Sequence, residues 1–445
     1  MDFIAELEWR GMLHQLTPGI REHLAEQPRR AYIGFDPTAP SMTIGNYVQL
    51  MILTHWMRAG HEAVFLFGGA TGRIGDPSGK DKERELKTYE ELDHNLAHQR
   101  RQVETLLHRL SGGGAAGAGE KNKPITPSSY RIVNNYDFYR DMGALEFLRD
   151  VGKTLTISYM MSKDSVQNRL ESGMSFTEFS YQLLQGYDFQ RLYSDYGVTV
   201  QMGGSDQWGN ITAGTEFVRR NSGGKAYACT TPLLTKADGS KFGKSEAGNI
   251  WLDPDLTSPY DFYQFWVRSN DADIPTYLKY FSLRDRPSIL ADIETVEAHL
   301  AGEDRFREVK AIKESLAAEV TRRIHGEEGL RTALRVTELL YGRGATAEDL
   351  RSLDAKTLAS LGGNIPTFRL DRSQLPFQIQ ELLAEYTDIV ASKSEAKRAV
   401  QGNAISLNKE KIEDTEATIT ASDLLHDRFL MVENGKKRRY LVEFS

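Results

Sequence analysis

The chain has 445 residues, 40% hydrophobic and 26% charged, which is typical of globular proteins and long enough for two or three domains. Its net charge of −7 at pH 7 argues against non-specific coating of nucleic acid, although lysines and arginines cluster near the C-terminus. The single cysteine excludes an internal disulfide framework. Together with the lack of a signal-peptide pattern or a long apolar run, it predicts a cytoplasmic protein without a membrane span.

Two short apolar runs, at 30–35 and 63–67, are bounded by turn residues and predict buried strands. Between them, residues 44–60 have the apolar spacing of a helix that ends at a glycine. Strand, helix and strand in this order predict a parallel βαβ unit. A second strand–loop–helix set at 198–220 predicts a Rossmann-like, doubly wound parallel sheet, with a ligand site where the loops of its halves converge.

The rest of the sequence suggests further domains. We expect an α/β domain at 1–245, an α-helical domain at 246–345, a linker at 346–375 and a small α+β domain at 376–445. The Gly- and Ala-rich segment 111–124 has no apolar periodicity, so we expect a flexible surface loop there.

The loop after the first strand reads "GFDPTAPSMTIGN" and combines prolines that prevent regular structure with glycines that let a ligand approach. A helix that begins near Ile44 would point its N-terminal amides at an anion. Thr38 and Thr43 could add hydroxyl donors, while Asp36 could hold an amine or a ribose. Taken alone, a turn whose hydroxyl residues cap the helix is the simpler interpretation.

Two other glycine-containing loops follow predicted strands. "GGATGRIGDPSGK" has five glycines but neither the dinucleotide-binding nor the P-loop spacing, and its Asp76 could bind an ammonium group. In "QMGGSDQWGNI", Asp206 could take ribose hydroxyls and Gln207 a carboxylate. For the second loop alone, capping of the following helix by Ser205 or Asp206 is the favoured interpretation.

The segment "SFTEFSYQLLQGYDFQRLY" predicts a helix that carries Tyr181, Gln185 and Asp188 on one face. A hydroxyl, an amide and a carboxylate in a row beside apolar neighbours need hydrogen-bond partners, and a substrate in a pocket would supply them. An ordinary solvated face is an equal alternative for this helix alone.

The loop "TKADGSKFGKSEAG" brings Lys241, Lys244 and Ser245 together, which suits a polyphosphate whose negative charge grows as it leaves. In isolation a solvated lysine loop is the commoner explanation. A Pro- and Gly-containing turn after the first strand, followed by a Lys-x-Gly-Lys-Ser loop after the last strand, is far more specific than either part.

These motifs, in this order, resemble the bacterial-type tyrosyl-tRNA synthetases of class I nearly from end to end. "GFDPTAPSMTIGN" occupies the place of the HIGH signature, and "KFGKS" is similar to the KMSKS signature. "GGATGRIGDPSGK", "SFTEFSYQLLQGYDF", "GGSDQWGNITAG" and "HGEEGLR" also resemble the family. The tail "SKSEAKRAVQGNAISLN" is similar to an S4-type RNA-binding module.

The resemblance implies a tyrosine–tRNA ligase that uses Mg-ATP as a substrate, holds no metal of its own, and forms a homodimer through helices near 140–172. The residues implied for tyrosine binding are Tyr32, Asp76, Tyr181, Gln185, Asp188 and Gln207. Those implied for ATP are Gly34, Asp36, Gly45, Asn46, Gly204, Asp206 and Lys244. The catalytic set is Lys241, Lys244, Ser245, Thr38 and Thr43, to which Lys80 and Arg84 could add pyrophosphate or tRNA contacts. The set implied for tRNA(Tyr) is Lys393, Lys397, Arg398, Lys436, Lys437, Arg438 and Arg439.

The chain departs from the family pattern at the two histidines of the HIGH signature, which are Thr43 and Asn46 here. Thr43 is shorter than histidine and never charged, so it reaches a terminal phosphate only if ATP lies closer or through water. Because every other polar position of the cleft is present, we interpret Thr43 as a tolerated variant. In the tail, Lys409 stands where S4 turns usually have glycine.

Two alternatives remain at this point. In a tryptophan-specific class I synthetase an indole N–H could pair with Asp188, but Tyr32 and the S4-like tail favour tyrosine. A catalytically silent, synthetase-like RNA-binding protein is supported by Thr43 alone and opposed by the intact "KFGKS".

Overall fold

The computed structural model describes residues 1–78, 86–111, 123–163, 166–167, 173–245, 248–342, 345–435 and 438–445. They form two compact units, the first made of Met1–Thr257 and Phe265–Gly326, the second of Ser258–Gln264 and Glu327–Ser445. Among the predictions, residues 112–122 of the Gly-rich loop lie outside the described residues. So do four predicted contact residues: Lys80, Arg84, Lys436 and Lys437.

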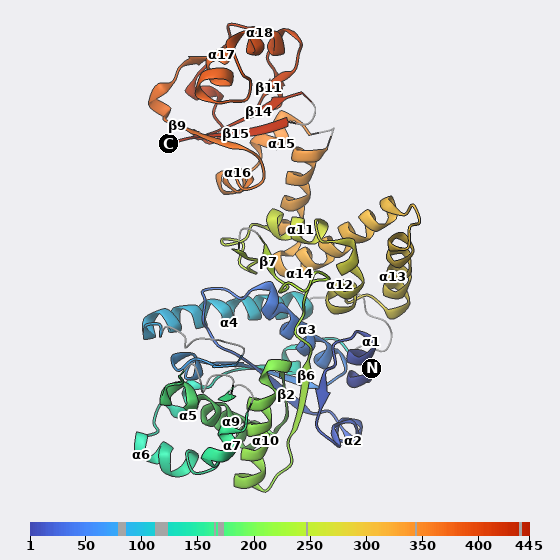
Figure 1. Ribbon diagram of the computed structural model, residues 1–445, viewed down its shortest axis with the longest axis vertical. Coiled ribbons are helices and arrows are strands. Elements are labelled where there is room, and N and C mark those ends of the chain that lie inside the picture. The colour runs from blue at the N-terminus through green and yellow to red at the C-terminus, as the bar shows by residue number, and fades with distance from the viewer. Residues whose placement is uncertain are drawn as a thin grey trace. The chain divides into compact units, whose positions relative to one another are not determined.

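The first unit is built on a six-stranded sheet with the order β1-β6-β5-β2-β3-β4 (Figure 1). The strands are β1 (Gln15–Leu16), β2 (Arg30–Phe35), β3 (Glu62–Phe67), β4 (Tyr130–Asn134), β5 (Val198–Gly204) and β6 (Tyr227–Thr231). All neighbours are parallel except β1, which runs antiparallel to β6 at the edge. The doubly wound sheet is therefore confirmed, and its order reverses between β2 and β5, where such sheets bind ligands.

Helices cover both faces of this sheet. Helices α3 (Ile44–Arg58) and α4 (Tyr89–Ser111) lie on one face, and α9 (Phe176–Tyr196) and α10 (Trp208–Ser222) on the other (Figure 1). Because both faces are covered, the central strands β3 and β5 are buried almost continuously along their length rather than on alternate residues. The only cysteine, Cys229, lies on β6, and burial raises the pKa of its thiol to about 12.

Further helices complete the first unit and lead into the second. They are α1 (Phe3–Trp9), α2 (Ile20–Glu26), α5 (Tyr136–Tyr139), α6 (Ala144–Glu146), α7 (Ile157–Met161), α11 (Pro259–Val267), α12 (Ile274–Phe281), α13 (Arg286–Leu300) and α14 (Phe306–Tyr341). Helix α14 is interrupted at Gly326, which has a φ of 78° and lies on the boundary between the two units. Within the described ranges, no helix is long and apolar enough to cross a membrane.

The second unit contains a five-stranded sheet with the order β12-β11-β14-β15-β9. Its strands are β9 (Thr367–Leu370), β11 (Ile405–Leu407), β12 (Glu410–Lys411), β14 (Phe429–Asn434) and β15 (Arg438–Phe444). A second, two-stranded sheet pairs β10 (Phe377–Gln378) with β13 (Thr418–Ile419), and the helix α18 (Lys393–Gln401) packs its apolar side into the core of this unit.

The segment expected to be a linker, 346–375, is largely structured. It contains α15 (Ala347–Arg351), α16 (Ala355–Leu361) and β9. The two helices and the turn between them bury Leu350, Leu353, Leu358 and Leu361 in one apolar cluster, so this stretch contributes to the core. The leucines are divided between two short helices and a turn, so they do not form one helical pattern in the sequence.

Lys409 adopts a left-handed backbone conformation with a φ of 72°, which is costly for a residue with a side chain. Its ammonium donates to the Leu339 carbonyl and to Glu433, each at 2.8 Å, and its side chain is 7% exposed. These contacts offset the strain at a position where glycine would be relaxed.

Candidate active site

A cavity of about 330 Å³ opens at the carboxyl ends of β2 and β5, at the point where the strand order reverses. The structure brings together there all six residues implied for tyrosine and all those implied for ATP except Lys244. Thr38 lines the cavity as well, whereas Thr43, Lys241 and Lys244 do not. The predicted polar row of Tyr181, Gln185 and Asp188 on α9 therefore faces a cavity, not solvent.

Asp188 forms the deepest acidic group of the cavity and is only 1% exposed. Its two oxygens accept hydrogen bonds from the Asn135 amide at 2.9 Å and the Tyr139 hydroxyl at 2.7 Å. Burial raises the pKa of Asp188 to about 7, and these two donors counteract part of that rise. A carboxylate oxygen can accept more than one hydrogen bond, so Asp188 can still receive a donor from a ligand.

The cavity wall holds several buried oxygens with no hydrogen-bond partner among the described residues. They come from β2, α3, α9 and β5, and are the Tyr32 hydroxyl and the amide oxygens of Gln49, Gln185 and Gln201. Buried polar atoms are nearly always paired in folded proteins. A ligand with several polar groups would satisfy these atoms together.

A continuous network connects the two acids Asp36 and Asp188. The Tyr181 hydroxyl donates to Asp36 at 2.9 Å, and the Thr71 hydroxyl donates to the other Asp36 oxygen at 2.7 Å. Asn135 then donates to Thr71 at 3.0 Å as well as to Asp188. Gly68 makes this packing possible, because a Cβ there would lie 2.0 Å from an Asp36 oxygen.

Asp76 is the centre of a second group of hydrogen bonds in the cavity wall. It accepts from the Gln207 amide at 2.7 Å, from Asn210 at 3.3 Å and from the Ser78 backbone amide at 2.9 Å. The strand-end loops after β3 and β5 are thereby held together, with one acid facing the cavity.

Thr43 and Asn46 form a capping box at the start of α3. The Thr43 hydroxyl accepts from the Asn46 backbone amide, and the Asn46 side chain accepts from the Thr43 backbone at 2.9 Å. These two residues therefore satisfy the helix terminus itself. Gly45 and Asn46 line the cavity while Thr43 does not.

The "KFGKS" segment lies against the first turn of α3. A Cβ on Gly243 would lie 2.7 Å from the Ile44 side chain and 3.4 Å from the Gly45 nitrogen. Beyond it, the Ile44 amide donates to the Ile250 carbonyl and the Leu252 amide donates to the Met42 carbonyl, each at 2.9 Å. These bonds join residues 42–44 to residues 250–252. Lys241 and Lys244 are exposed, and Ser245 ends the short strand β7 (Lys244–Ser245).

Helix α4 supplies residues that sequence analysis missed. Asn95 donates to the Pro37 carbonyl at 3.1 Å and Gln99 to the Ala39 carbonyl at 2.8 Å. Gln102 accepts from the Met42 amide at 3.0 Å and also donates to the Ser41 hydroxyl at 2.9 Å. These three amides recur at i, i+4 and i+7 along α4, the same spacing that revealed the row on α9, so their periodicity could have identified them.

In the second unit the basic residues predicted to contact RNA differ in their surroundings. Lys397 and Arg398 are exposed on α18 and Arg438 is exposed on β15. Lys393 is paired with Glu385 at 3.1 Å, and Arg439 with Glu433 at 2.9 Å.

The sequence was also compared with known families. The model of class I tRNA synthetases for tryptophan and tyrosine matches residues 24–342, and the model of a tyrosine–tRNA ligase C-terminal domain matches residues 358–442. The chain is 46% identical to the tyrosine–tRNA ligase of Cytophaga hutchinsonii, which it matches over 100% of both chains. The chain belongs to the class I tyrosyl-tRNA synthetases.

Further comparisons agree with this family. The tyrosine–tRNA ligase of Porphyromonas gingivalis is 46% identical over 99% of both chains. Among solved structures, a C-terminally truncated mitochondrial tyrosyl-tRNA synthetase of Aspergillus nidulans is 33% identical, with a TM-score of 0.66 over 76% of this chain and 94% of that chain. The family match at 24–342 is common to tryptophan and tyrosine enzymes, whereas the C-terminal match and these relatives concern tyrosine, so the tryptophan-specific alternative is disfavoured.

Family membership gives the capping box at Thr43 a testable consequence. We expect Thr43→His to lower the free energy of unfolding by about 1 kcal/mol, because the cap is lost. We expect the rate of tyrosine-dependent ATP–pyrophosphate exchange to stay within roughly tenfold, about 1.4 kcal/mol of barrier, since Thr43 does not line the cavity. Urea unfolding and exchange assays would measure the two effects, and a much larger change in exchange in either direction would contradict the second.

Proposed function

We propose that the cavity binds L-tyrosine and Mg-ATP together and forms tyrosyl-adenylate and pyrophosphate, after which the tyrosyl group passes to the terminal ribose hydroxyl of tRNA(Tyr). The observation that best supports this proposal is the convergence of Tyr32, Asp188, Asp76, Tyr181 and Gln185 on one cavity. The substrate carboxylate is already a nucleophile, so the first step needs alignment and charge stabilisation rather than a general base.

The phenol of the substrate would lie at the end formed by Tyr32 and Asp188. The unpartnered Tyr32 hydroxyl would hydrogen-bond to the phenolic oxygen of the substrate, and the buried Asp188 carboxylate would accept from the phenolic O–H. Phenylalanine would leave the Tyr32 hydroxyl without a partner and would give Asp188 no donor beyond Asn135 and Tyr139. Buried polar groups of this kind discriminate strongly against an analogue that lacks a hydroxyl. Tyrosyl-tRNA synthetases are themselves the standard example of this discrimination.

The other end of the amino acid would meet the second group of polar residues. Asp76, Tyr181 and Gln185 would hold the α-ammonium, and Gln207 would direct the carboxylate toward the α-phosphorus. The hydrogen bond from Gln207 to Asp76 supports this arrangement, because it holds the amide beside the acid.

ATP would occupy the glycine-lined part of the cavity, with Gly34, Asp36, Gly204 and Asp206 around the adenosine. Gly45, Asn46 and Thr38 would lie beside the phosphates, and the N-terminal amides of α3 favour an anion at that place. Lys241, Lys244 and Ser245 would bind the departing pyrophosphate. Because the two lysines are exposed outside the cavity, the loop would have to bend toward bound ATP.

ATP–pyrophosphate exchange with tyrosine, phenylalanine and tryptophan in parallel tests this function. Exchange that depends on tyrosine and is far weaker with the other two amino acids is expected. Absence of exchange with all three, in protein that still binds tRNA, would favour a silent RNA-binding protein instead.

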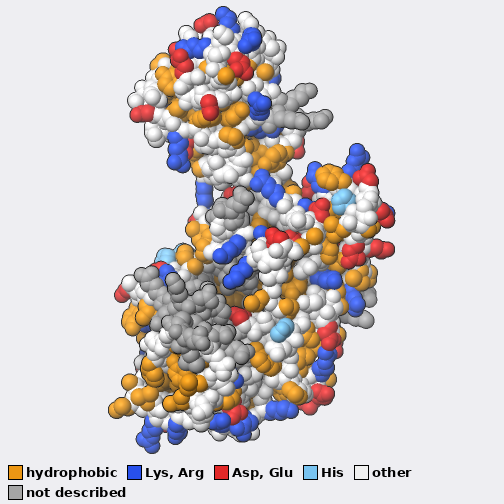
Figure 2. Space-filling view, viewed as in Figure 1, with side chains coloured by type: hydrophobic (Ala, Val, Ile, Leu, Met, Phe, Trp, Pro, Cys, Tyr) orange, Lys and Arg blue, Asp and Glu red, His pale blue; other side chains and the backbone are white. Residues whose placement is uncertain are grey.

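We also propose that two copies of the chain pair through the helices near 140–172. The described residues of this stretch, and Phe176 just beyond it, include several exposed large apolar side chains: Leu145, Leu148, Ile157, Met161 and Phe176. Figure 2 shows hydrophobic side chains gathered over the part of the first unit that carries α5, α6 and α7. Concentrated exposure of this kind is typical of a protein interface.

We expect Leu145→Asp to weaken dimerisation at least tenfold, about 1.4 kcal/mol, without unfolding the protomer, because this side chain is 83% exposed. Sedimentation velocity over a concentration series would measure the dissociation constant. Leu290→Asp, at an exposed leucine on α13, is the matched control and should leave it unchanged. A native chain that sediments as a monomer would contradict the interface.

A further inference from the structure

The loop that carries Lys241 and Lys244 is anchored by Phe242, which follows Lys241 directly. Phe242 is 8% exposed and packs on four aromatic rings, those of Phe265, Trp266, Tyr277 and Phe281, with centroid distances of 5.2 to 6.2 Å. Its nearly parallel stacking is on Phe281, at 5.3 Å and 23°. The exposed lysines thus flank a buried aromatic anchor.

Phe281 also stacks on the helix that begins at the cavity. Its ring lies 5.6 Å from that of Tyr47 on α3, with an angle of 7° between the two planes. Tyr47 follows Asn46, which lines the cavity. One buried ring is therefore in contact with both the "KFGKS" loop and the first turns of α3, the two segments proposed to hold the phosphates.

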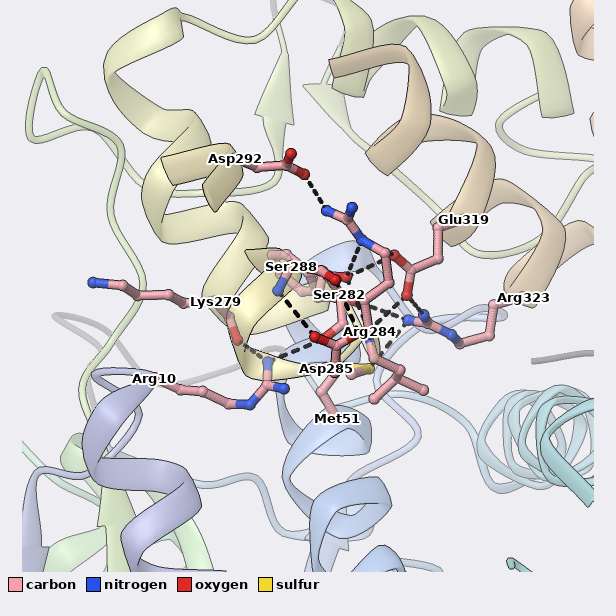
Figure 3. A network of polar contacts seen from close by, with 12 residues as sticks. Arg10, Met51, Lys279, Ser282, Arg284, Asp285, Ser288, Asp292, Glu319 and Arg323 are labelled. Atoms are coloured by element: carbon pink, nitrogen blue, oxygen red, sulfur yellow. Dashed lines mark hydrogen bonds and ion pairs between the residues drawn. The ribbon is translucent and has the colours of Figure 1, made fainter. Parts of the chain in front are cut away.

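The backbone around Phe281 accepts hydrogen bonds from three buried arginines that lie far apart in the sequence. Arg323 on α14 donates to the Phe281 carbonyl at 2.8 Å. Arg10, just after α1, donates to the Ser282 carbonyl at 2.9 Å, and Arg58 on α3 donates to the Leu283 carbonyl at 3.1 Å. Figure 3 shows Arg10 and Arg323 approaching the turn from opposite sides.

The hydrogen-bond donors of the same turn also have a charged partner, and Arg323 connects the turn to α3. Glu319 accepts from the Ser282 hydroxyl and from the Leu283 amide, each at 2.7 Å. Arg323 pairs with Glu319 and donates to the Tyr47 hydroxyl at 2.7 Å. Successive backbone groups of one short turn are thus satisfied by charged side chains, so the position of the Phe281 ring is set by the whole unit.

We propose that Phe281 is a positioning residue for adenylate formation. Its ring is a fixed surface on which Phe242 packs, and this packing determines where Lys241 and Lys244 contact the phosphates beside α3. This inference rests on the proposed role of the two lysines. Leucine at either aromatic position would keep the site apolar but remove the flat surface. A displacement of about 1 Å in a group that must meet developing charge can cost up to 100-fold in rate.

Rapid mixing of the full chain with tyrosine and ATP tests the proposal through single-turnover formation of tyrosyl-adenylate. We expect Phe281→Leu to slow this step at least about tenfold. The dissociation constant for tyrosine and the transfer from preformed adenylate to tRNA should change less than about twofold, since neither uses the lysines. Phe242→Leu, which changes the loop residue of the same stacked pair, should slow adenylate formation in the same way. It replaces Phe281→Leu in the test if that variant does not fold.

Phe3→Leu is the matched control, because Phe3 is equally buried in the same unit but packs on Trp56. It should lower stability similarly and leave adenylate formation unchanged. Equal slowing by Phe3→Leu and Phe281→Leu, or equal effects of Phe281→Leu on formation, tyrosine binding and transfer, would overturn the proposal.

A double-mutant cycle with Lys244→Ala separates this inference from the proposed function. In the Lys244→Ala background, Phe281→Leu should slow formation by less than about twofold further, because both changes act through one loop. If Lys244→Ala slowed adenylate formation and Phe281→Leu did not, the positioning role of Phe281 would be overturned and the proposed role of the lysines would stand. If Lys241→Ala and Lys244→Ala both formed adenylate at the native rate, the proposed role of the lysines would be overturned, and the positioning role of Phe281 with it.

Discussion

Asp188→Asn is expected to lower kcat/KM for tyrosine by roughly 30- to 150-fold, about 2–3 kcal/mol of transition-state stabilisation. The carboxylate is buried and accepts from Asn135 and Tyr139, so an amide would place its NH₂ group against one of these donors. It would also replace the charged acceptor proposed for the substrate phenol. Phenylalanine should lose far less, so the selectivity ratio between the two amino acids falls.

Steady-state exchange with both amino acids would measure this selectivity. Asp195→Asn, on the same helix but partly exposed and paired with Arg191, is the control and should behave like the native chain. If Asp188→Asn slowed the use of tyrosine and phenylalanine by the same factor, the carboxylate would have no part in recognising the hydroxyl.

The pH dependence of tyrosine use provides an independent check on Asp188. Because its pKa is raised from 3.8 to about 7, Asp188 is mostly protonated below neutral pH and then offers the phenol an uncharged, weaker acceptor. We expect kcat/KM for tyrosine to rise about tenfold per pH unit up to about pH 7 and to level off above it. The Asp188→Asn variant should lack this rise.

The sign of the linked stability distinguishes this effect from acid unfolding. A carboxyl whose pKa is raised on folding binds its proton more tightly in the folded chain. Asp188 therefore contributes stability that is complete below about pH 4 and is lost as pH rises toward 7. Protonation of Asp188 between pH 7 and pH 6 should therefore lower kcat/KM for tyrosine without destabilising the fold.

Gly243→Ala is expected to slow adenylate formation at least roughly tenfold, about 1.4 kcal/mol, with little change in tyrosine binding. Gly243 has a φ of 84°, which costs an alanine about 1–2 kcal/mol. The added Cβ would also lie 2.7 Å from Ile44, pushing the loop away from the first turn of α3. Single-turnover kinetics and equilibrium binding of tyrosine would measure the two quantities.

Gly239 gives this experiment a close control within the same loop. It has a φ of 81°, yet a Cβ there would meet nothing within 4 Å. Gly239→Ala thus introduces the same backbone strain without the collision. If both alanine variants slowed the reaction equally, strain alone would explain the result and the contact with α3 would be irrelevant.

The sequence predicted those parts of the site that depend on local periodicity. Strand β2, the start of α3 and the shared face of Tyr181, Gln185 and Asp188 follow from spacing along one segment, and the structure has all three. The doubly wound sheet followed from the repeated strand–loop–helix pattern.

The remaining contacts depend on pairs that lie far apart in the chain. Asn135 lies just before the short helix α5 and Tyr139 ends it, in a stretch without a motif, and only the fold brings them to Asp188. The sequence motif suggests that Thr43 faces the phosphates of ATP, whereas its hydrogen bonds in the structure are with Asn46 in the helix cap. The arginines around Phe281 come from three distant segments of the chain, so no single segment of sequence predicts that they meet.

The burial of Cys229 on β6 has a practical consequence for observing the "KFGKS" loop. Thiol reagents attack the thiolate, and a buried thiol with a pKa of about 12 supplies almost none near neutral pH. Since the chain has no other cysteine, Asp238→Cys at an exposed point of the loop would give one reactive site for a fluorophore. Loop movement during turnover could then be followed in the otherwise native sequence.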